Sequence, residues 1–215
     1  MSRKVKARIA FGIAGMIAAA LIVFALAMSY FHEKAEVSPS PESPAVQVTD
    51  DGFPVVDWEY WQGVNPDVIG WVTVPGTVID HPIVQAPADD PDYYLHHDVY
   101  RDYNVYGVPY LDADCADTGL LSSRNAVVFG HHMNDGSMFA AFADYSDPDF
   151  ANDHAEILVQ TPDGKQVYSV RLVEIVNGAE LAKRTDFKDE ADYRAWYDNQ
   201  LSGAEVVIDN ITQPE

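Results

Sequence analysis

The sequence is poor in cysteine and in basic residues, and each shortage excludes a class of protein. Cys115 is the only cysteine among 215 residues, which excludes an internal disulfide framework and a zinc site built from several cysteines. Lysine and arginine number 13 against 34 acidic residues, for a formal net charge of -21. Such a surface repels phosphate backbones, so we expect no nucleic-acid partner. The acidity is typical of a solvated surface; an acidic docking face for a basic substrate tail is the alternative.

Familiar catalytic and metal-binding signatures are missing as well. The sequence has no Gly-x-Ser-x-Gly elbow, so serine hydrolase chemistry has no support. No histidine belongs to a His-Glu-x-x-His motif or another recognised ligand spacing, so we expect neither a metal nor a cofactor. Cys115 lies between Asp112, Asp114 and Asp117, and this acidic surrounding favours the inert thiol. We therefore expect a packing role for Cys115 rather than a nucleophilic one.

The N-terminus has the pattern of a membrane anchor. Residues 9–30 contain no charge and are long enough to span a bilayer as a helix, and four basic residues precede them. The positive-inside rule then places residues 1–8 in the cytoplasm and the rest outside the membrane. A cleaved signal peptide is the alternative, because Ala25-Leu26-Ala27 fits a small-x-small cleavage site, although the apolar run is long for one.

A spacer separates this anchor from the folded part. Residues 31–52 include the Pro/Ser-rich stretch 38–44 and are expected to be extended and semi-rigid. The folded domain is expected over residues 53–215. It begins with a short helix at 57–63, capped by Asp57, and continues in short strands at 69–74, 79–85, 106–111, 126–130, 157–160 and 165–176. A helix near 186–201, capped by Asp186, follows. Many strands with few helices predict a mainly β barrel or sandwich.

The densest polar segment follows the apolar run 126–129. It reads Gly-His-His-Met-Asn-Asp-Gly-Ser-Met-Phe over residues 130–139. A histidine just past a strand end can project into a cleft, and its neutral form suits proton transfer near physiological pH. The alternative is that His131 and His132 are surface or core histidines with no catalytic task.

Several segments, in their order and spacing, resemble the class B sortases. They are Asn-Pro-Asp-Val-Ile-Gly-Trp-Val-Thr-Val-Pro-Gly-Thr at 65–77, Ile-Asp-His-Pro-Ile-Val-Gln at 79–85, Asp-Tyr-Tyr-Leu at 92–95, Tyr-Gly-Val-Pro-Tyr-Leu-Asp at 106–112 and residues 128–139. The resemblance runs from about Asp57 to the end of the chain. It implies an eight-stranded sortase-type β-barrel with an added N-terminal helix and an added helix that corresponds to 186–201.

The resemblance also implies an activity and partners. Class B sortases are cysteine transpeptidases that cleave a C-terminal sorting signal and join the surface protein to an amine of a peptidoglycan precursor or a pilin. A cysteine thiolate forms an acyl-enzyme, a histidine transfers protons, and an arginine steadies the oxyanion. The histidine role falls on His131, and Leu95 is a candidate for substrate binding. His132 stands where the family commonly has asparagine.

Two family residues have no counterpart here. The resemblance places the nucleophilic cysteine and the oxyanion arginine on strands that would follow Glu215, and Arg124, Arg171, Arg184 and Arg194 occupy other segments. We therefore expect a barrel without its last two strands, with the edge of the histidine strand unpaired, and a chain inactive as given. The interpretations are a fragment of a longer gene product, a non-catalytic membrane-anchored binding protein on the sortase fold, or an unrelated anchored β-domain.

Overall fold

The computed structural model describes residues 47–176 and 183–208, which lie in a compact unit starting at Val46. The predicted anchor at 9–30 and most of the predicted spacer are outside the described residues. Within the described ranges, none of the helices combines the length and the apolar character needed to cross a bilayer.

The first helix and the hairpins form where local signals predict them. Asp57 caps α2 (Trp58–Val64) by accepting a hydrogen bond from the Tyr60 amide at 2.9 Å. The strands β1 (Val68–Thr73) and β2 (Asp80–Gln85) pair in antiparallel fashion across a turn that contains Gly76 at a φ of +79°. The strands β5 (Glu156–Thr161) and β6 (Gly164–Ser169) form a hairpin across Pro162-Asp163.

The remaining elements are short. β3 (Tyr110–Leu111) and β4 (Val128–Phe129) cover only part of the predicted strands at 106–111 and 126–130. The 3-10 turns η1 (Tyr93–Leu95), η2 (Ala113–Cys115) and η3 (Ala140–Ser146) and the helix α3 (Pro148–Asp153) connect the strands. Near the C-terminus lie β7 (Leu172–Val173), α4 (Glu190–Gly203) and β8 (Val206–Val207).

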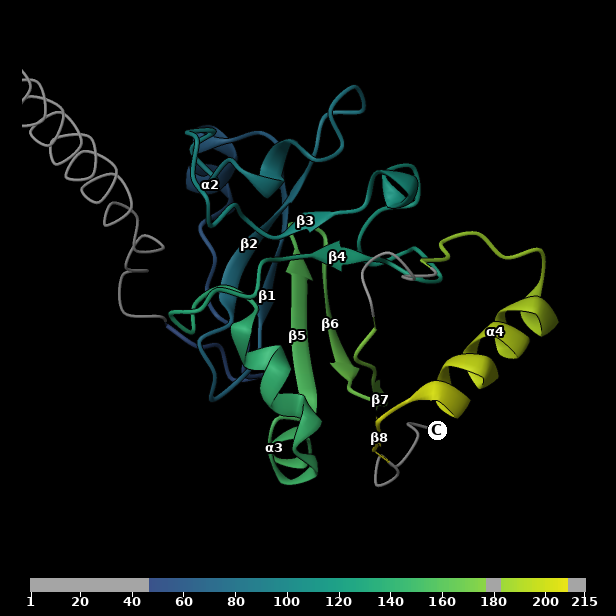
Figure 1. Cartoon of the computed structure of the whole chain (residues 1–215). Helices are drawn as coiled ribbons and strands as arrows, with labels where there is room; N and C mark the ends of the chain where they lie inside the picture. The colour runs from purple at the N-terminus through teal and green to yellow at the C-terminus, as the bar shows by residue number, and fades with distance from the viewer. Residues whose placement is uncertain (1–46, 177–182, 209–215) are drawn as a thin grey trace, which may run out of the picture. The chain divides into compact units, whose positions relative to one another are not determined.

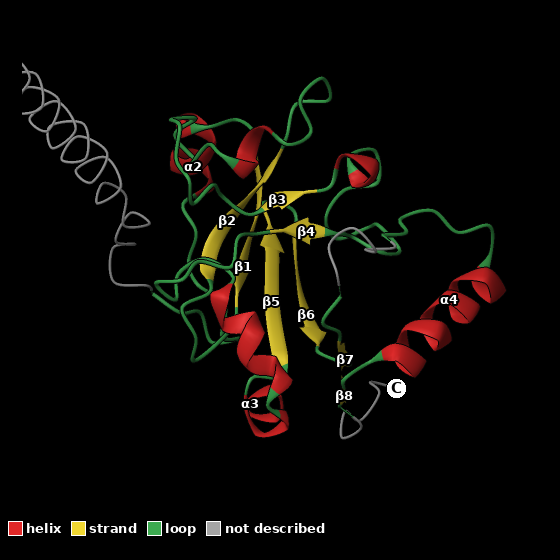
Figure 2. Cartoon of the chain, viewed as in Figure 1, coloured by secondary structure: helices red, strands yellow, loops and turns green. Residues whose placement is uncertain are grey.

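The main sheet has the order β4-β3-β2-β1-β5-β6 and curls into a half-barrel (Figure 1). In Figure 2 the short strands β3 and β4 lie roughly horizontally, whereas β5 and β6 run roughly vertically. The predicted mainly β architecture is therefore confirmed. β4 lies at one end of the sheet order, so within the described residues it pairs only with β3. In this part of the chain, the strand that leads to His131 therefore has one edge without a partner strand.

An aromatic core cluster lies between α2, β1 and η1. The Trp61 and Trp71 ring centroids are 5.4 Å apart, and Tyr94 packs in the same cluster with no exposed surface. Burial of side chains of this size contributes roughly 1.5–3 kcal/mol each. The turn η1, which carries Leu95, is therefore packed against this core.

The predicted helix at 186–201 starts later than expected. The helix is α4, Glu190–Gly203, and its cap is Asp189, whose carboxylate accepts from the Asp192 amide at 2.9 Å. Asp186 is not the cap; instead its carbonyl accepts from Arg184 Nε at 3.2 Å. The capping prediction was wrong because two aspartates three residues apart compete for the role, and the contact with Arg184 keeps the first one outside the helix.

The predicted strand at 165–176 is interrupted. β6 ends at Ser169, and the Val170 amide then donates to Ala155 O at 2.7 Å. After this break β7 pairs with β8 in a separate two-stranded sheet. The Val170 bond continues the β5–β6 register by one residue, and the chain changes partner at Leu172, where β7 pairs with β8.

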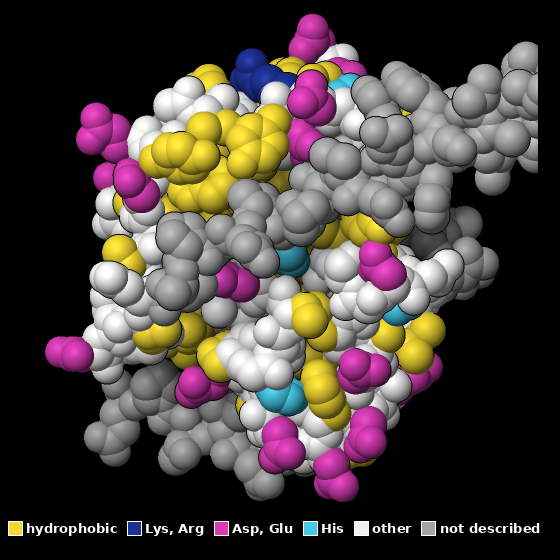
Figure 3. Space-filling view, turned by 90° about the vertical axis from the view of Figure 1, so that its left-hand side faces the viewer, with side chains coloured by type: hydrophobic (Ala, Val, Ile, Leu, Met, Phe, Trp, Pro, Cys, Tyr) yellow, Lys and Arg dark blue, Asp and Glu magenta, His cyan; other side chains and the backbone are white. Residues whose placement is uncertain are grey.

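The surface agrees with the acidic composition. Figure 3 shows acidic side chains spread over one face of the molecule, whereas basic side chains on that face gather at one place. The basic residues of the described domain are largely paired; for example, Lys165 Nζ lies 3.2 Å from Asp51 and Arg101 Nη2 lies 2.7 Å from Asp67. Such exposed pairs contribute little to stability.

Candidate active site

Gly130 places His131 directly after β4. A Cβ on Gly130 would lie 2.3 Å from the Phe139 ring, so only glycine allows that ring to pack against the backbone. The Phe139 amide in turn donates to the His131 carbonyl at 2.9 Å, and His132 forms an isolated β-bridge with Met138. Residues 131–139 are therefore a closed loop that holds His131 at its base.

Asp135 organises the tip of this loop. Its carboxylate accepts from the Ser137 amide at 3.0 Å, from the Ser137 hydroxyl at 2.6 Å and from the Tyr106 hydroxyl at 2.7 Å. The Ser137 and Tyr106 hydrogen bonds hold the pKa of Asp135 below its usual value. The same contact with Asp135 raises the pKa of Tyr106. The loop is thus fastened to the segment before β3, although the sequence offered no signal for this pairing.

The His131 ring contacts the backbone of the residue predicted to bind substrate. Its Nε2 lies 2.8 Å from the Leu95 carbonyl oxygen, and its ring lies 6.1 Å from that of His96 at an interplanar angle of 24°. A carbonyl can only accept, so Nε2 carries the hydrogen and the Nδ1 of a neutral ring is left free to take up a proton. The structure therefore brings His131 and Leu95 together.

Gly107 packs closely against the backbone carbonyls of Tyr94 and Leu95. It has a φ of +58°, and a Cβ there would lie 2.5 Å from Tyr94 O and 2.8 Å from Leu95 O. Sequence reasoning assigned no role to Gly107. A lone glycine inside an apolar run is, however, a signal of close backbone approach.

The other histidines lie in different environments. His81 is buried in β2, where burial lowers its pKa, and its Nε2 has no hydrogen-bond partner within the described domain. The His154 ring contacts Pro75 O at 2.9 Å, and the His97 ring stacks on Tyr93 at 3.9 Å. None of these three shares the contact that His131 makes with Leu95.

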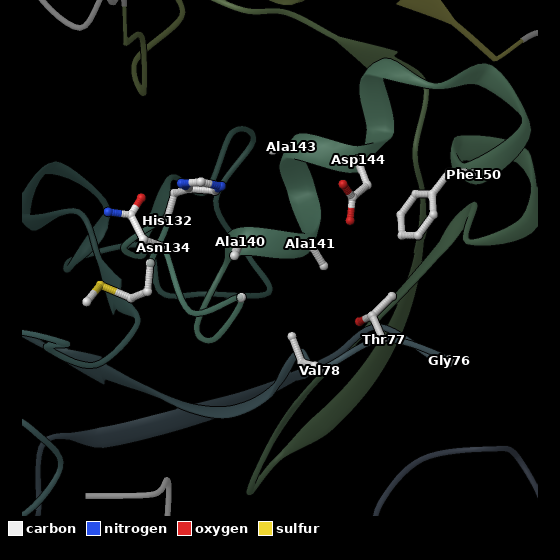
Figure 4. A pocket seen from close by; sticks show the side chains of 12 residues that line it. Gly76, Thr77, Val78, His132, Asn134, Ala140, Ala141, Ala143, Asp144 and Phe150 are labelled. Carbon is white, nitrogen blue, oxygen red and sulfur yellow. The ribbon is translucent and has the colours of Figure 1, made fainter. Parts of the chain in front are cut away.

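His132 lines a pocket of about 410 Å3 on another side of its loop. Figure 4 shows His132 and Asn134 at one end of this pocket and Thr77, Asp144 and Phe150 at the other. The two adjacent histidines therefore lie in different surroundings: His132 lines this pocket, whereas the His131 ring contacts the Leu95 carbonyl.

Cys115 lies in the core rather than in a cleft. Its side chain is 1% exposed, and Sγ contacts the Asn125 carbonyl at 3.5 Å. Neighbouring Asp112 is also buried and is paired with Lys183 Nζ at 2.5 Å. A buried thiol in hydrogen-bond contact with a carbonyl is not accessible to a peptide, so its environment agrees with the packing role predicted for it.

Four arginines occupy segments other than the one expected for the oxyanion arginine, and three of them are paired with acidic residues. Arg124 and Arg194 pair with Glu190, and Arg184 pairs with Asp192. The Arg124 and Arg184 pairs link α4 to preceding segments, the Arg194 pair lies within α4, and none of the three involves His131.

The comparisons with known proteins agree on one family. No family model matches the chain. Sortase B of Listeria monocytogenes is 33% identical over 136 residues, which are 60% of this chain and 53% of that protein. Sortase B of Staphylococcus aureus is 27% identical over 141 residues, which are 66% of this chain and 56% of that protein. The chain thus spans about half the length of these relatives.

Solved sortase B structures match the described domain. A Staphylococcus aureus sortase B-substrate complex has a TM-score of 0.65 at 25% identity, covering 72% of this chain and 69% of that one. Clostridium perfringens sortase B has a TM-score of 0.65 at 28% identity, covering 71% of this chain and 82% of that one. In sequence and in fold, the chain is a relative of the class B sortases.

Proposed function

We propose that the protein to which this chain belongs is a class B sortase, a cysteine transpeptidase that joins surface proteins with a C-terminal sorting signal to an amine of the cell wall or of a pilin. The 215 residues alone lack the nucleophile and are expected to be inactive. The observation that carries the proposal is the His131 ring, held by the Leu95 carbonyl at Nε2 with Nδ1 free. The relationship to sortase B supports it.

In this proposal His131 is the proton carrier. A thiolate attacks the scissile carbonyl of the sorting signal, and His131 Nδ1–H protonates the leaving amine as the acyl-enzyme forms. The neutral ring then takes a proton from the incoming amine as that amine attacks the thioester and releases the thiolate, which restores the starting state. Throughout both steps the Leu95 carbonyl keeps Nε2 protonated, and it stabilises the positively charged ring before the first step and after the second. Leu95 also borders the peptide site.

The thiolate is not that of Cys115, because the Cys115 sulfur is buried against Asn125 O. Cys115 is the only cysteine among these 215 residues, so in this proposal the attacking thiolate lies outside them. The same burial favours a second candidate function. In that reading the domain binds sorting signals without cleaving them, as a membrane-anchored surface protein.

The function is tested in the cells that make the protein. Deleting the gene should reduce the peptidoglycan-linked set of surface proteins, measured by mass spectrometry of purified walls, and the unlinked proteins should appear in the medium. The wild-type gene and a Cys115→Ala version should restore linkage equally, provided immunoblots show equal amounts of protein. An unchanged wall proteome after deletion would sink the transpeptidase proposal, and failure of Cys115→Ala alone would make Cys115 the nucleophile.

We further propose that the domain lies outside the cytoplasm, with residues 9–30 as its anchor. The support is the distribution of charge, with basic residues before this apolar stretch and acidic residues dominating after it. Protease added to protoplasts should remove the domain. Survival of the domain in intact protoplasts, with digestion after lysis, would place it inside the cell.

A further inference from the structure

A buried polar network connects the start of β1 to the turn that carries Leu95. Asn65 has no exposed surface, and its Nδ2 donates to the Tyr94 hydroxyl at 2.8 Å. The Tyr94 hydroxyl donates to Asp67 Oδ2 at 2.7 Å. Arg101 closes the network, with Nη2 2.7 Å from Asp67 Oδ2 and Nε 3.1 Å from Asn65 Oδ1. We call these four residues the Asn65 network.

The protonation states in this network fit its geometry. Burial, and next the hydrogen bond to Asp67, raise the pKa of Tyr94, so its hydroxyl keeps the proton it donates. Contacts with Tyr94 and Asp67 raise the pKa of Arg101, which stays charged. Buried polar groups that have partners fix a unique arrangement, whereas a buried group left without one costs free energy.

Arg101 is held in an unusual backbone conformation. Its φ of +66° lies in the left-handed region, which is unfavourable for residues with a Cβ. The Arg101 amide donates to Asp98 O at 2.9 Å, and its carbonyl accepts from the Tyr93 hydroxyl at 3.3 Å. The backbone strain is therefore offset by contacts that direct the guanidinium toward Asn65 and Asp67.

The network ends one residue away from the contact made by His131. Tyr94 directly precedes Leu95, and the Tyr94 carbonyl accepts from the Val108 amide at 3.2 Å. Holding the Tyr94 hydroxyl at one end and its carbonyl at the other fixes the peptide group that leads to the Leu95 carbonyl. That carbonyl is the acceptor for His131 Nε2.

We propose that the Asn65 network positions His131, by holding η1 so that the Leu95 carbonyl meets the imidazole Nε2. The inference deepens the proposed function and rests on it for the task that His131 performs. Asn65, Asp67, Tyr94 and Arg101 are positioning residues, because they act through Leu95 and do not touch the ring. The outer end of the network is open to solvent, with the Arg101 and Asp67 side chains 45% and 28% exposed. Arg101 can therefore be changed without opening the core.

The test follows the hydrogen on His131 Nε2 in the full chain. With 15N-labelled histidine, this ring N–H is assigned by its loss in His131→Gln, and its exchange with water is measured by NMR. Arg101→Gln should speed the exchange about tenfold, because loosening η1 weakens the hydrogen bond to Leu95 O. Tyr94→Phe, which keeps the ring but loses both hydroxyl contacts, should have the same effect. The exchange rate in Arg101→Lys should lie between those of the wild type and Arg101→Gln, because lysine keeps the charge near Asp67 but lacks the planar guanidinium group.

Arg124→Gln is the matched control. The Arg124 side chain is 46% exposed and pairs with Glu190, so it equals Arg101 in exposure and in having an acidic partner. It should leave the His131 ring proton unchanged. Wild-type exchange in both Arg101→Gln and Tyr94→Phe, or an equal change in Arg124→Gln, would overturn the proposal. Because this readout does not depend on transpeptidation, failure of the proposed function would show instead in the wall proteome.

Discussion

Replacing His131 with alanine should abolish the linkage of surface proteins to the wall in cells that make this protein. General acid–base catalysis by a positioned side chain contributes typically about 10²–10⁴-fold to a rate, and among the described histidines it is the His131 ring that the Leu95 carbonyl holds at 2.8 Å. The wall proteome of His131→Ala cells should therefore match that of cells without the gene. Pulse-labelling of one affected surface protein gives the rate of linkage directly.

His132→Ala is the control for this experiment, because it removes the adjacent histidine from the same loop. His132 is exposed and lines the pocket with Asn134 and Asp144 (Figure 4), so its loss should leave linkage close to the wild-type rate. The non-catalytic binding function makes a different prediction: a His131→Ala protein present at the normal level would work like the wild type. Equal losses in the two variants would assign the effect to the loop rather than to proton transfer.

Local signals in the sequence were enough to predict the elements that frame the site. Asp57 marks the start of α2 because a carboxylate can satisfy a free amide of the first turn. The hairpin of β5 and β6 follows from Pro162-Asp163-Gly164 between two apolar runs. These signals act over a few residues, so they do not depend on how the rest of the chain packs.

Elements whose ends depend on distant partners were predicted less well. β6 ends at Ser169 although the apolar pattern continues, because the chain leaves β5 after Val170 and β7 pairs with β8 instead. α4 starts after Asp189 rather than Asp186, because Arg184 contacts the Asp186 carbonyl. Local propensity cannot decide between such competing partners.

In the candidate site, too, local patterns predicted individual residues but not the contacts between distant ones. The motif at 130–139 identified His131, and the resemblance to sortases identified Leu95, but neither predicts that one contacts the other across 36 positions of the sequence. The Asn65 network joins Arg101 to Asp67 over 34 positions. Both contacts depend on how η1 packs on the core around Tyr94, and this is a property of the folded chain.

Gly107→Ala should be among the most destabilising single changes in the domain. The new methyl would have to occupy a left-handed residue and would lie 2.5 Å from Tyr94 O and 2.8 Å from Leu95 O. The conformation alone costs about 1 kcal/mol. Displacing two backbone carbonyls should bring the total to about 3 kcal/mol or more, within the range of severe backbone effects. The midpoint of urea unfolding should fall accordingly.

Gly119→Ala separates the two contributions, because Gly119 has a φ of +78° but no atom within 4 Å of the added Cβ. It should lose only the conformational part, about 1 kcal/mol. The difference between the two variants then measures how tightly the backbone around Leu95 is packed. Gly107→Ala should also speed exchange of the His131 ring proton, whereas Gly119→Ala should not, since only the first displaces the carbonyl that His131 contacts. Equal unfolding midpoints for both variants would mean that the segment around Leu95 yields easily, and a carbonyl that yields easily cannot hold the His131 ring in place.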